Sequence, residues 1–286
     1  MHAMSKCLQR AAEAVFGKQG MGQNSCLQMI YSIVKVYKRL KEEGGIELAD
    51  SVQALVVQRV VDNGEMQEEL EHNCSQGFEK CVDAINSDDI EEILEYFRSP
   101  RNIQEPVWTR WMTTVHAATM VVDNWPQIYA TLVAVKNSKK ASSHLAKTAN
   151  DALSLMKTKA AECDKVPLFY AQLLFLKSFA EDFFTNAYDM AMMADPEYGH
   201  SSYGYTSRKC VERCYLMKKQ LNDLADSSSS NSWTNRSGFA EYREAIEGIS
   251  ELGEINKGGR EFFRQLPDTF LKTFCASYVK LVQSCW

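Results

Sequence analysis

The sequence predicts an all-α protein, folded as an irregular bundle of many helices. Two observations lead to this class. Apolar residues recur at steps of three and four along most of the chain, which is the spacing of one face of an α-helix. Glycine and proline are scarce, with 14 and 6 residues among 286, and this disfavours turn-rich and multi-stranded β proteins. No segment has a convincing strand pattern, and no internal repeat of fixed period is present.

Breaks between apolar stripes define the predicted helices of the first hundred residues. Gly44 and Gly45 end the second of them, whose stripe is the clearest. Ser87 is a good start for the last, and Glu91 lies one position off the capping-box spacing. Valines in the third leave a strand open as an alternative. The predicted helices are Ser5–Phe16, Cys26–Lys41, Ala49–Asp62, Glu65–Ala84 and Ile90–Phe97.

Helices continue to the end of the chain, and polar turns separate them. Pro126 favours the first turn of a helix after a break at Asn124, and Asn137 to Lys140 form a basic turn. The serine-rich stretch Ser227–Ser237 has low complexity and is expected to be mobile. The predicted helices are Thr109–Val122, Gln127–Val135, Ser143–Cys163, Val166–Met193, Thr206–Ala225, Ala240–Gly253 and Thr269–Ser284.

Composition excludes several classes of protein. The chain is 45% hydrophobic and 24% charged, which is enough apolar material for a core and too much for a disordered chain. No uncharged apolar run approaches the roughly 20 residues of a membrane span, and the N-terminus does not resemble a signal peptide. Nine scattered cysteines indicate a reducing compartment with mostly buried thiols. We therefore expect a nuclear or cytoplasmic protein that is not secreted.

Charge is distributed unevenly along the chain, whose net charge is −5. Residues 42–95 contain sixteen acidic and two basic residues, whereas residues 98–177 contain eleven basic and five acidic ones. The second stretch is the better surface for phosphate, although both could be ordinary solvated helix faces. Two prolines in residues 98–107 mark the best candidate for a domain border. We predict an N-terminal helical region, residues 1–100, and a helical domain, residues 101–286.

The residues give little support to catalysis or to a metal site. Cys210 and Cys214 lie four residues apart on one helix face and could supply two zinc ligands, but a structural zinc site needs four. His200 is ten residues from the pair, and no fourth ligand is evident, so buried thiols are the simpler interpretation. No G-x-S-x-G nucleophile motif occurs. We expect no catalytic residue, no metal and no cofactor.

The segment Trp108-Thr109-Arg110-Trp111 stands out in the more basic half of the chain. Tryptophan can stack on a nucleic-acid base, and arginine can bind a phosphate or stack by its planar face. An ordinary helix start, with one buried indole and one ion-paired arginine, explains the same residues. The cluster is therefore a candidate nucleic-acid contact with a structural alternative.

The segment Glu105–Ala118, continued by Asn124–Tyr129, resembles the C-terminal part of hAT-type transposases, which carry a Thr-Arg-Trp motif near a helical insertion in a ribonuclease-H-like domain. A weaker resemblance covers Cys7–Arg10 and Val15–Asn24, which look like the helix that follows a Cys-x-x-His element in that family. His2 would be the histidine of this element, as a motif remnant, and its cysteine would fall before Met1.

The resemblance implies the helical insertion of a truncated or degenerate transposase without catalytic activity. The family joins DNA with divalent metal held by three carboxylates, and its first two aspartates lie upstream of the Cys-x-x-His element. No family motif selects the third carboxylate among the late glutamates, such as Glu241 and Glu244. Arg110 and Trp111 match the Arg-Trp pair of the family, so the resemblance implies that they would lie near flanking DNA. Residual nonspecific DNA binding would use Arg110, Trp111, Lys136, Lys139 and Lys140.

A competing interpretation is a helical interaction or scaffold protein with no nucleic-acid role. It would use an apolar helix face such as Leu168–Phe184 for self-association or for binding partner helices. A third interpretation, an enzyme with a pocket inside a helical bundle, has no motif in its support. No membrane partner is expected under any of them.

Overall fold

The computed structural model describes most of the predicted helices. The described residues are 2–16, 25–43, 50–56, 58, 70, 83, 87, 90–97, 111–157, 167–184, 207–250 and 257–284. No β-strand occurs among them, which confirms the predicted all-α class. The helices are α1 (His2–Phe16), α2 (Cys26–Glu43), α6 (Ile90–Tyr96), α7 (Trp111–Asp123), α8 (Trp125–Asn137), α9 (Ser143–Met156), α10 (Leu168–Phe179), α12 (Ser207–Ala225), α13 (Ala240–Ser250) and α14 (Lys257–Ser284).

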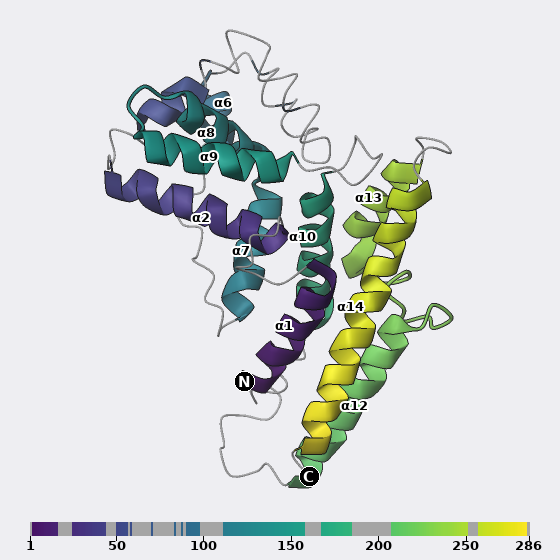
Figure 1. The fold of residues 1–286 in the computed structure, drawn as a ribbon. Helices are drawn as coiled ribbons and strands as arrows, with labels where there is room; N and C mark the ends of the chain where they lie inside the picture. Colours follow the sequence, from purple (N-terminus) through teal and green to yellow (C-terminus); the bar gives the residue numbers. More distant parts are fainter. Residues whose placement is uncertain are drawn as a thin grey trace.

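The helices form two groups on either side of α10 (Figure 1). One group contains α2, α6, α8 and α9, with α8 packed on α9 and α9 packed on α2. The other contains α1, α13 and the long pair of α12 and α14, which ends at the C-terminus. α7 packs along α10 and leads into the first group. One hydrophobic cluster extends through both groups, from Cys7 to Tyr278.

Local sequence signals explain where α8 and α9 begin and end. Pro126 occupies the first turn of α8, where a missing N–H costs nothing. Ser142 caps α9, because its Oγ accepts a hydrogen bond from the backbone N–H of Leu145 at 3.2 Å. The turn between the two helices includes Ser138, Lys139 and Lys140 and matches the predicted basic turn.

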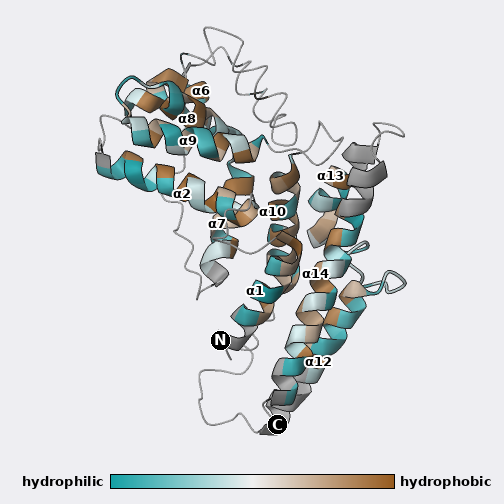
Figure 2. Ribbon diagram, viewed as in Figure 1, coloured by the Kyte–Doolittle hydropathy of each residue, from teal (hydrophilic) through white to brown (hydrophobic). Residues whose placement is uncertain are grey.

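A cluster of aromatic rings joins α10 to the helices on its other side. Phe175 and Phe179 are fully buried on α10, one helical turn apart. The centroid of Phe179 lies 4.9 Å from that of Phe270 and 5.4 Å from that of Phe274, both on α14. The Phe175 ring lies 5.3 Å from that of Tyr242 on α13. Figure 2 shows α10 as hydrophobic along much of its length, whereas α2 alternates between polar and apolar residues.

The prediction that Leu168–Phe184 offers an apolar face for association is wrong, because α10 is buried. Phe169, Leu173 and Leu176 are buried, as are most other described residues of Leu168–Phe184. The chain's own helices cover this apolar segment, so it offers no free docking face. The helix also changes form at its end, where Ala180–Phe184 is a π-helical turn. The predicted continuation to Met193 lies outside the described residues.

The serine-rich stretch forms a packed turn, in contrast to the expected mobile segment. Trp233 is buried, and its backbone N–H donates to the carbonyl of Leu224 at 3.0 Å. Its indole Nε1 donates to Asp268 of α14 at 3.3 Å, and Arg243 of α13 donates to its carbonyl at 3.1 Å. Ser232 is fully buried beside it. One large aromatic side chain thus anchors a segment whose composition alone suggested a linker.

The start of the last helix differs from its predicted position. α14 begins twelve residues before the predicted Thr269 and runs through Pro267. Buried residues on both sides of the proline, Phe263 and Phe270 among them, keep this face of the helix on the core. Ahead of α6, the Ser87 hydroxyl donates to Glu92 at 2.6 Å, whereas the sequence analysis had considered Glu91.

The predicted border between residues 1–100 and 101–286 falls in residues 98–110, outside the described part. Helices from the two sides of it are packed together: α1 lies against α14, and α2 lies against α9. The two-domain division stays a prediction. Within the described residues, no helix is both long and apolar enough to cross a membrane.

Candidate nucleic-acid interface

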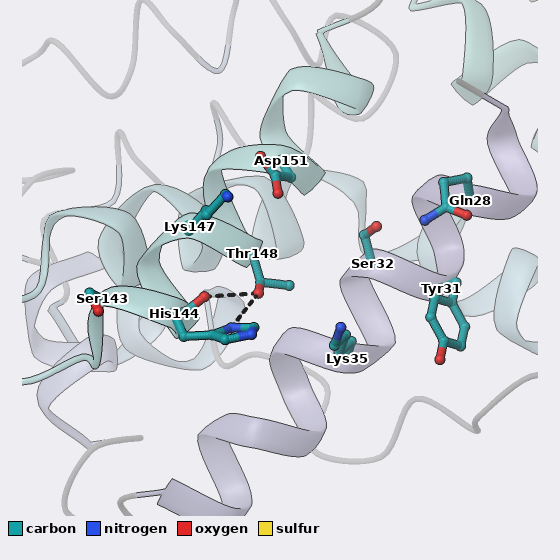
Figure 3. A pocket seen from close by; sticks show the side chains of 9 residues that line it. All are labelled: Gln28, Tyr31, Ser32, Lys35, Ser143, His144, Lys147, Thr148 and Asp151. Carbon is teal, nitrogen blue, oxygen red and sulfur yellow. Dashed lines mark hydrogen bonds between the residues drawn. The ribbon is translucent and has the colours of Figure 1, made fainter. Parts of the chain in front are cut away.

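Polar stripes of α2 and α9 face each other across a groove of about 570 Å³ (Figure 3). On each helix the lining residues recur at steps of three or four, so they share one face. Gln28 and Asp151 lie toward one end, and Lys35 and His144 lie toward the other. The lining residues are Gln28, Tyr31, Ser32 and Lys35 of α2, and Ser143, His144, Lys147, Thr148 and Asp151 of α9.

His144 fixes the alignment of the two helices. An Nη atom of Arg39 on α2 lies 2.8 Å from His144 Nδ1. A guanidinium has only donors, so Nδ1 accepts this hydrogen bond. The Thr148 hydroxyl donates to the His144 carbonyl at 2.9 Å and lies 3.3 Å from Nδ1. The imidazole is therefore held by its own helix and by α2, and this contact brings the C-terminal half of α2 beside the first turn of α9.

The same alignment gathers lysines from distant parts of the sequence. The turn before α9 carries exposed Lys139 and Lys140, and Lys136 is exposed on the last turn of α8. We use the name basic surface for the cations of α2 and of the α8–α9 hairpin, of which Lys35 and Lys147 line the groove. They are Lys35, Lys38, Arg39, Lys41, Lys136, Lys139, Lys140 and Lys147.

Acidic residues are also present on this side of the molecule. Glu42 is exposed at the end of α2, and Asp151 lines the far end of the groove. Glu91 and Glu92 lie in the first turn of α6, in the same group of helices. None of these four carboxylates belongs to the α8–α9 turn, which carries Lys139 and Lys140.

The structure brings together only part of the site predicted from sequence. Lys136, Lys139 and Lys140 lie close in the chain at the α8–α9 turn. Trp111 begins α7, whereas those lysines follow the far end of α8, and α8 turns away from α7 at their junction (Figure 1). Each of these 13-residue helices is about 20 Å long. The start of α7 is therefore well separated from the lysines.

Other candidate residues lie at the edge of the described part or outside it. Arg110 is outside the described residues. His2 is the first residue of α1, but its side chain is not among those described, and the same holds for Trp111. The described lysine Lys157 ends α9 with its Nζ 5.4 Å above the centroid of the Tyr129 ring, so a cation–π contact occupies this lysine.

The residues that the sequence analysis missed belong mainly to α2. Tyr31 and Lys35 lie one turn apart within the predicted helix Cys26–Lys41, and His144 and Lys147 lie one turn apart within the predicted helix Ser143–Cys163. No local pattern shows that the two helices meet. The contact between Arg39 and His144 spans 105 residues of sequence.

A second charged cluster joins α7, α10 and α13. Lys177 Nζ lies 2.7 Å from Asp123 and 3.5 Å from Glu241. Burial alone would lower the pKa of Lys177, but the hydrogen bond to Asp123 and the nearby negative charges outweigh it and raise that pKa. Burial raises the pKa of Glu181, and neighbouring Asp123 and Glu241 add to this, although Lys177 opposes it. Glu241 therefore pairs with a lysine that ties three helices together.

Two of the three cysteines whose side chains are described are buried thiols, and the third, Cys275, is partly exposed. Cys7 and Cys26 are buried, and burial raises the pKa of both, which makes them poor nucleophiles. Cys210 and Cys214 lie on α12, and their side chains are not among those described. Within the described part of the chain, no group of three His, Cys, Asp or Glu side chains could hold a metal ion.

Comparisons with protein-family models, with curated proteins and with solved structures found no match. The resemblance of Glu105–Tyr129 to hAT transposases therefore stays a prediction.

Proposed function

We propose that this protein binds nucleic acid, DNA in particular, by its phosphate backbone, without catalysis and without reading the sequence. The observation that carries the proposal is the basic surface around the α2–α9 groove and the α8–α9 turn. Phosphate contacts by lysine and arginine provide most of the affinity of sequence-independent binding. The resemblance to hAT transposases favours DNA among the polyanions, and DNA as the ligand favours the nucleus as the location.

The overall charge of the protein limits the form that such binding can take. With a net charge of −5, the whole molecule is not attracted to DNA, so binding depends on a local patch. Attraction between separated charges is screened over about 8 Å at physiological ionic strength. Salt therefore screens the repulsion between DNA and distant acidic residues more strongly than it screens the attraction between phosphate and the lysines in contact with it. We expect weak binding that decreases steeply with salt.

A titration of the full-length chain tests the proposal. Fluorescently labelled 20-base-pair duplexes of unrelated sequence are titrated at several salt concentrations, and binding is followed by anisotropy. If about three to five phosphates are neutralised, the slope of log Kobs against log salt is about −2.7 to −4.5. Duplexes of different sequence should bind equally within about threefold. An absence of binding at about 50 mM salt, or a flat salt dependence, would contradict the proposal.

Protein–protein association through α12 is a second candidate function. Tyr215 and Leu216 are 73% and 47% exposed on this helix, and they are adjacent large side chains with no described contact to the core cluster. Exposed apolar pairs of this kind occur at protein interfaces. This candidate is the scaffold interpretation with its interaction surface on α12 in place of α10. An oligomer that forms without nucleic acid and that the Leu216→Ala variant loses would support it.

A further inference from the structure

Tyr31 gives the α2–α9 groove an aromatic wall among its cations. Its side chain lines the groove and is 37% exposed, which makes it one of the few large hydrophobic residues at the surface of the described chain. Lys35 follows one turn later on the same helix, and Lys147 faces the groove from α9 (Figure 3). An aromatic ring beside lysines is the arrangement with which proteins hold unpaired nucleotides.

We propose that the groove takes an unpaired nucleotide of single-stranded nucleic acid, with its base stacked on Tyr31 and its phosphate held by Lys35. This inference rests on the proposed function, because it specifies which form of nucleic acid the same surface prefers. A base in a duplex is already stacked on its neighbours and has no free face to offer to a side chain. The aromatic wall therefore favours single strands, whereas the lysines attract either form.

The polarity of the groove sets the direction of the bound nucleotide. Asp151 and Gln28 lie toward one end, and Lys35 lies toward the other. A carboxylate repels phosphate, so the phosphate lies toward Lys35 and the base lies toward Asp151. There Asp151 can accept a hydrogen bond from a base amino group, and Gln28 can donate or accept. The groove volume of about 570 Å³ is in the range of pockets that hold one small ligand.

The test compares single-stranded and duplex DNA on matched variants of the full-length chain. A labelled 20-nucleotide strand of mixed sequence and the corresponding duplex are titrated at the same salt concentration. The Tyr31→Ala variant should lose about tenfold in affinity for the single strand and less than twofold for the duplex. Tyr31→Phe keeps the ring and should bind the single strand within about threefold of wild type. The control is Lys272→Ala, which removes an exposed side chain from α14 and should change neither affinity.

The outcomes separate the two proposals. If wild type binds both forms and Tyr31→Ala weakens both equally or neither, the stacking proposal is wrong and the proposed function stands. If wild type binds neither form, both are wrong. A second measurement needs no variant: a strand containing 5-iodouracil is irradiated in complex with wild type, and the crosslinked peptide is identified by mass spectrometry. Crosslinking at Tyr31 is expected, and crosslinking confined to other aromatic residues would overturn the inference.

Discussion

Replacement of Phe179 by alanine should lower the free energy of unfolding by about 4 kcal/mol. The ring is fully buried on α10 and touches aromatic rings on two sides, including those of Phe270 and Phe274 on α14. Truncation removes its buried area, leaves a cavity and breaks the edge-to-face contacts that join the two groups of helices. Since domains are typically stable by only about 5–15 kcal/mol, the variant should lose roughly a quarter to four fifths of its stability.

Urea unfolding, followed by circular dichroism at 222 nm, measures this loss. The control is Lys272→Ala on α14, which removes an exposed side chain and should change stability by less than about 0.5 kcal/mol. A graded variant, Phe179→Leu, keeps most of the volume and should lose less than Phe179→Ala. If Phe179→Ala loses less than about 1 kcal/mol, α10 is not the centre of the core.

Reversal of three charges on the basic surface should weaken DNA binding by about a hundredfold at low salt. The variant combines Lys41→Glu, Lys139→Glu and Lys140→Glu, all at exposed positions. Each change removes a phosphate contact and adds a repulsive charge, so the salt slope should become less negative by about 2 to 3. Stability should change little, because none of the three side chains is buried. The measurement is the anisotropy titration described above, on the same duplexes.

The matched control reverses three exposed lysines on the other group of helices. Lys218→Glu, Lys272→Glu and Lys280→Glu change the net charge by the same amount but lie on α12 and α14. Binding should stay within about threefold of wild type, because the net charge acts only weakly at this distance. Equal losses in the two triple variants would mean that net charge, and not the basic surface, determines the affinity.

Local sequence patterns predicted most of the helices but not the partners of each helix. The apolar stripe of α2, the Ser142 cap of α9 and the Pro126 start of α8 are encoded within a few residues, and the structure contains all three. Boundaries were less certain where burial overrides a local signal. The last helix was predicted to begin at Thr269, but α14 begins at Lys257 and runs through Pro267, because buried residues on both sides of the proline hold it on the core.

The candidate site was only half accessible to sequence analysis. Lys136, Lys139 and Lys140 stand out as a basic turn, because they lie within five residues of one another. The α2 side of the site, with Tyr31, Lys35 and Arg39, lies beside α9 only because the two helices pack together. Local periodicity in the sequence does not reveal this packing. Conversely, Trp111 and Lys139 looked like one site because both fall in the basic half of the sequence, although the helices between them separate the two positions.

The most direct test of the central claim is lysine footprinting on the wild-type chain. The protein is acetylated at low reagent concentration with and without a saturating 20-nucleotide DNA strand, and the modified lysines are quantified by mass spectrometry. We expect DNA to protect Lys35, Lys139, Lys140 and Lys147 and to leave exposed Lys272 and Lys280 of α14 unchanged. Protection on α12 and α14 instead, or no protection on the basic surface, would contradict the account.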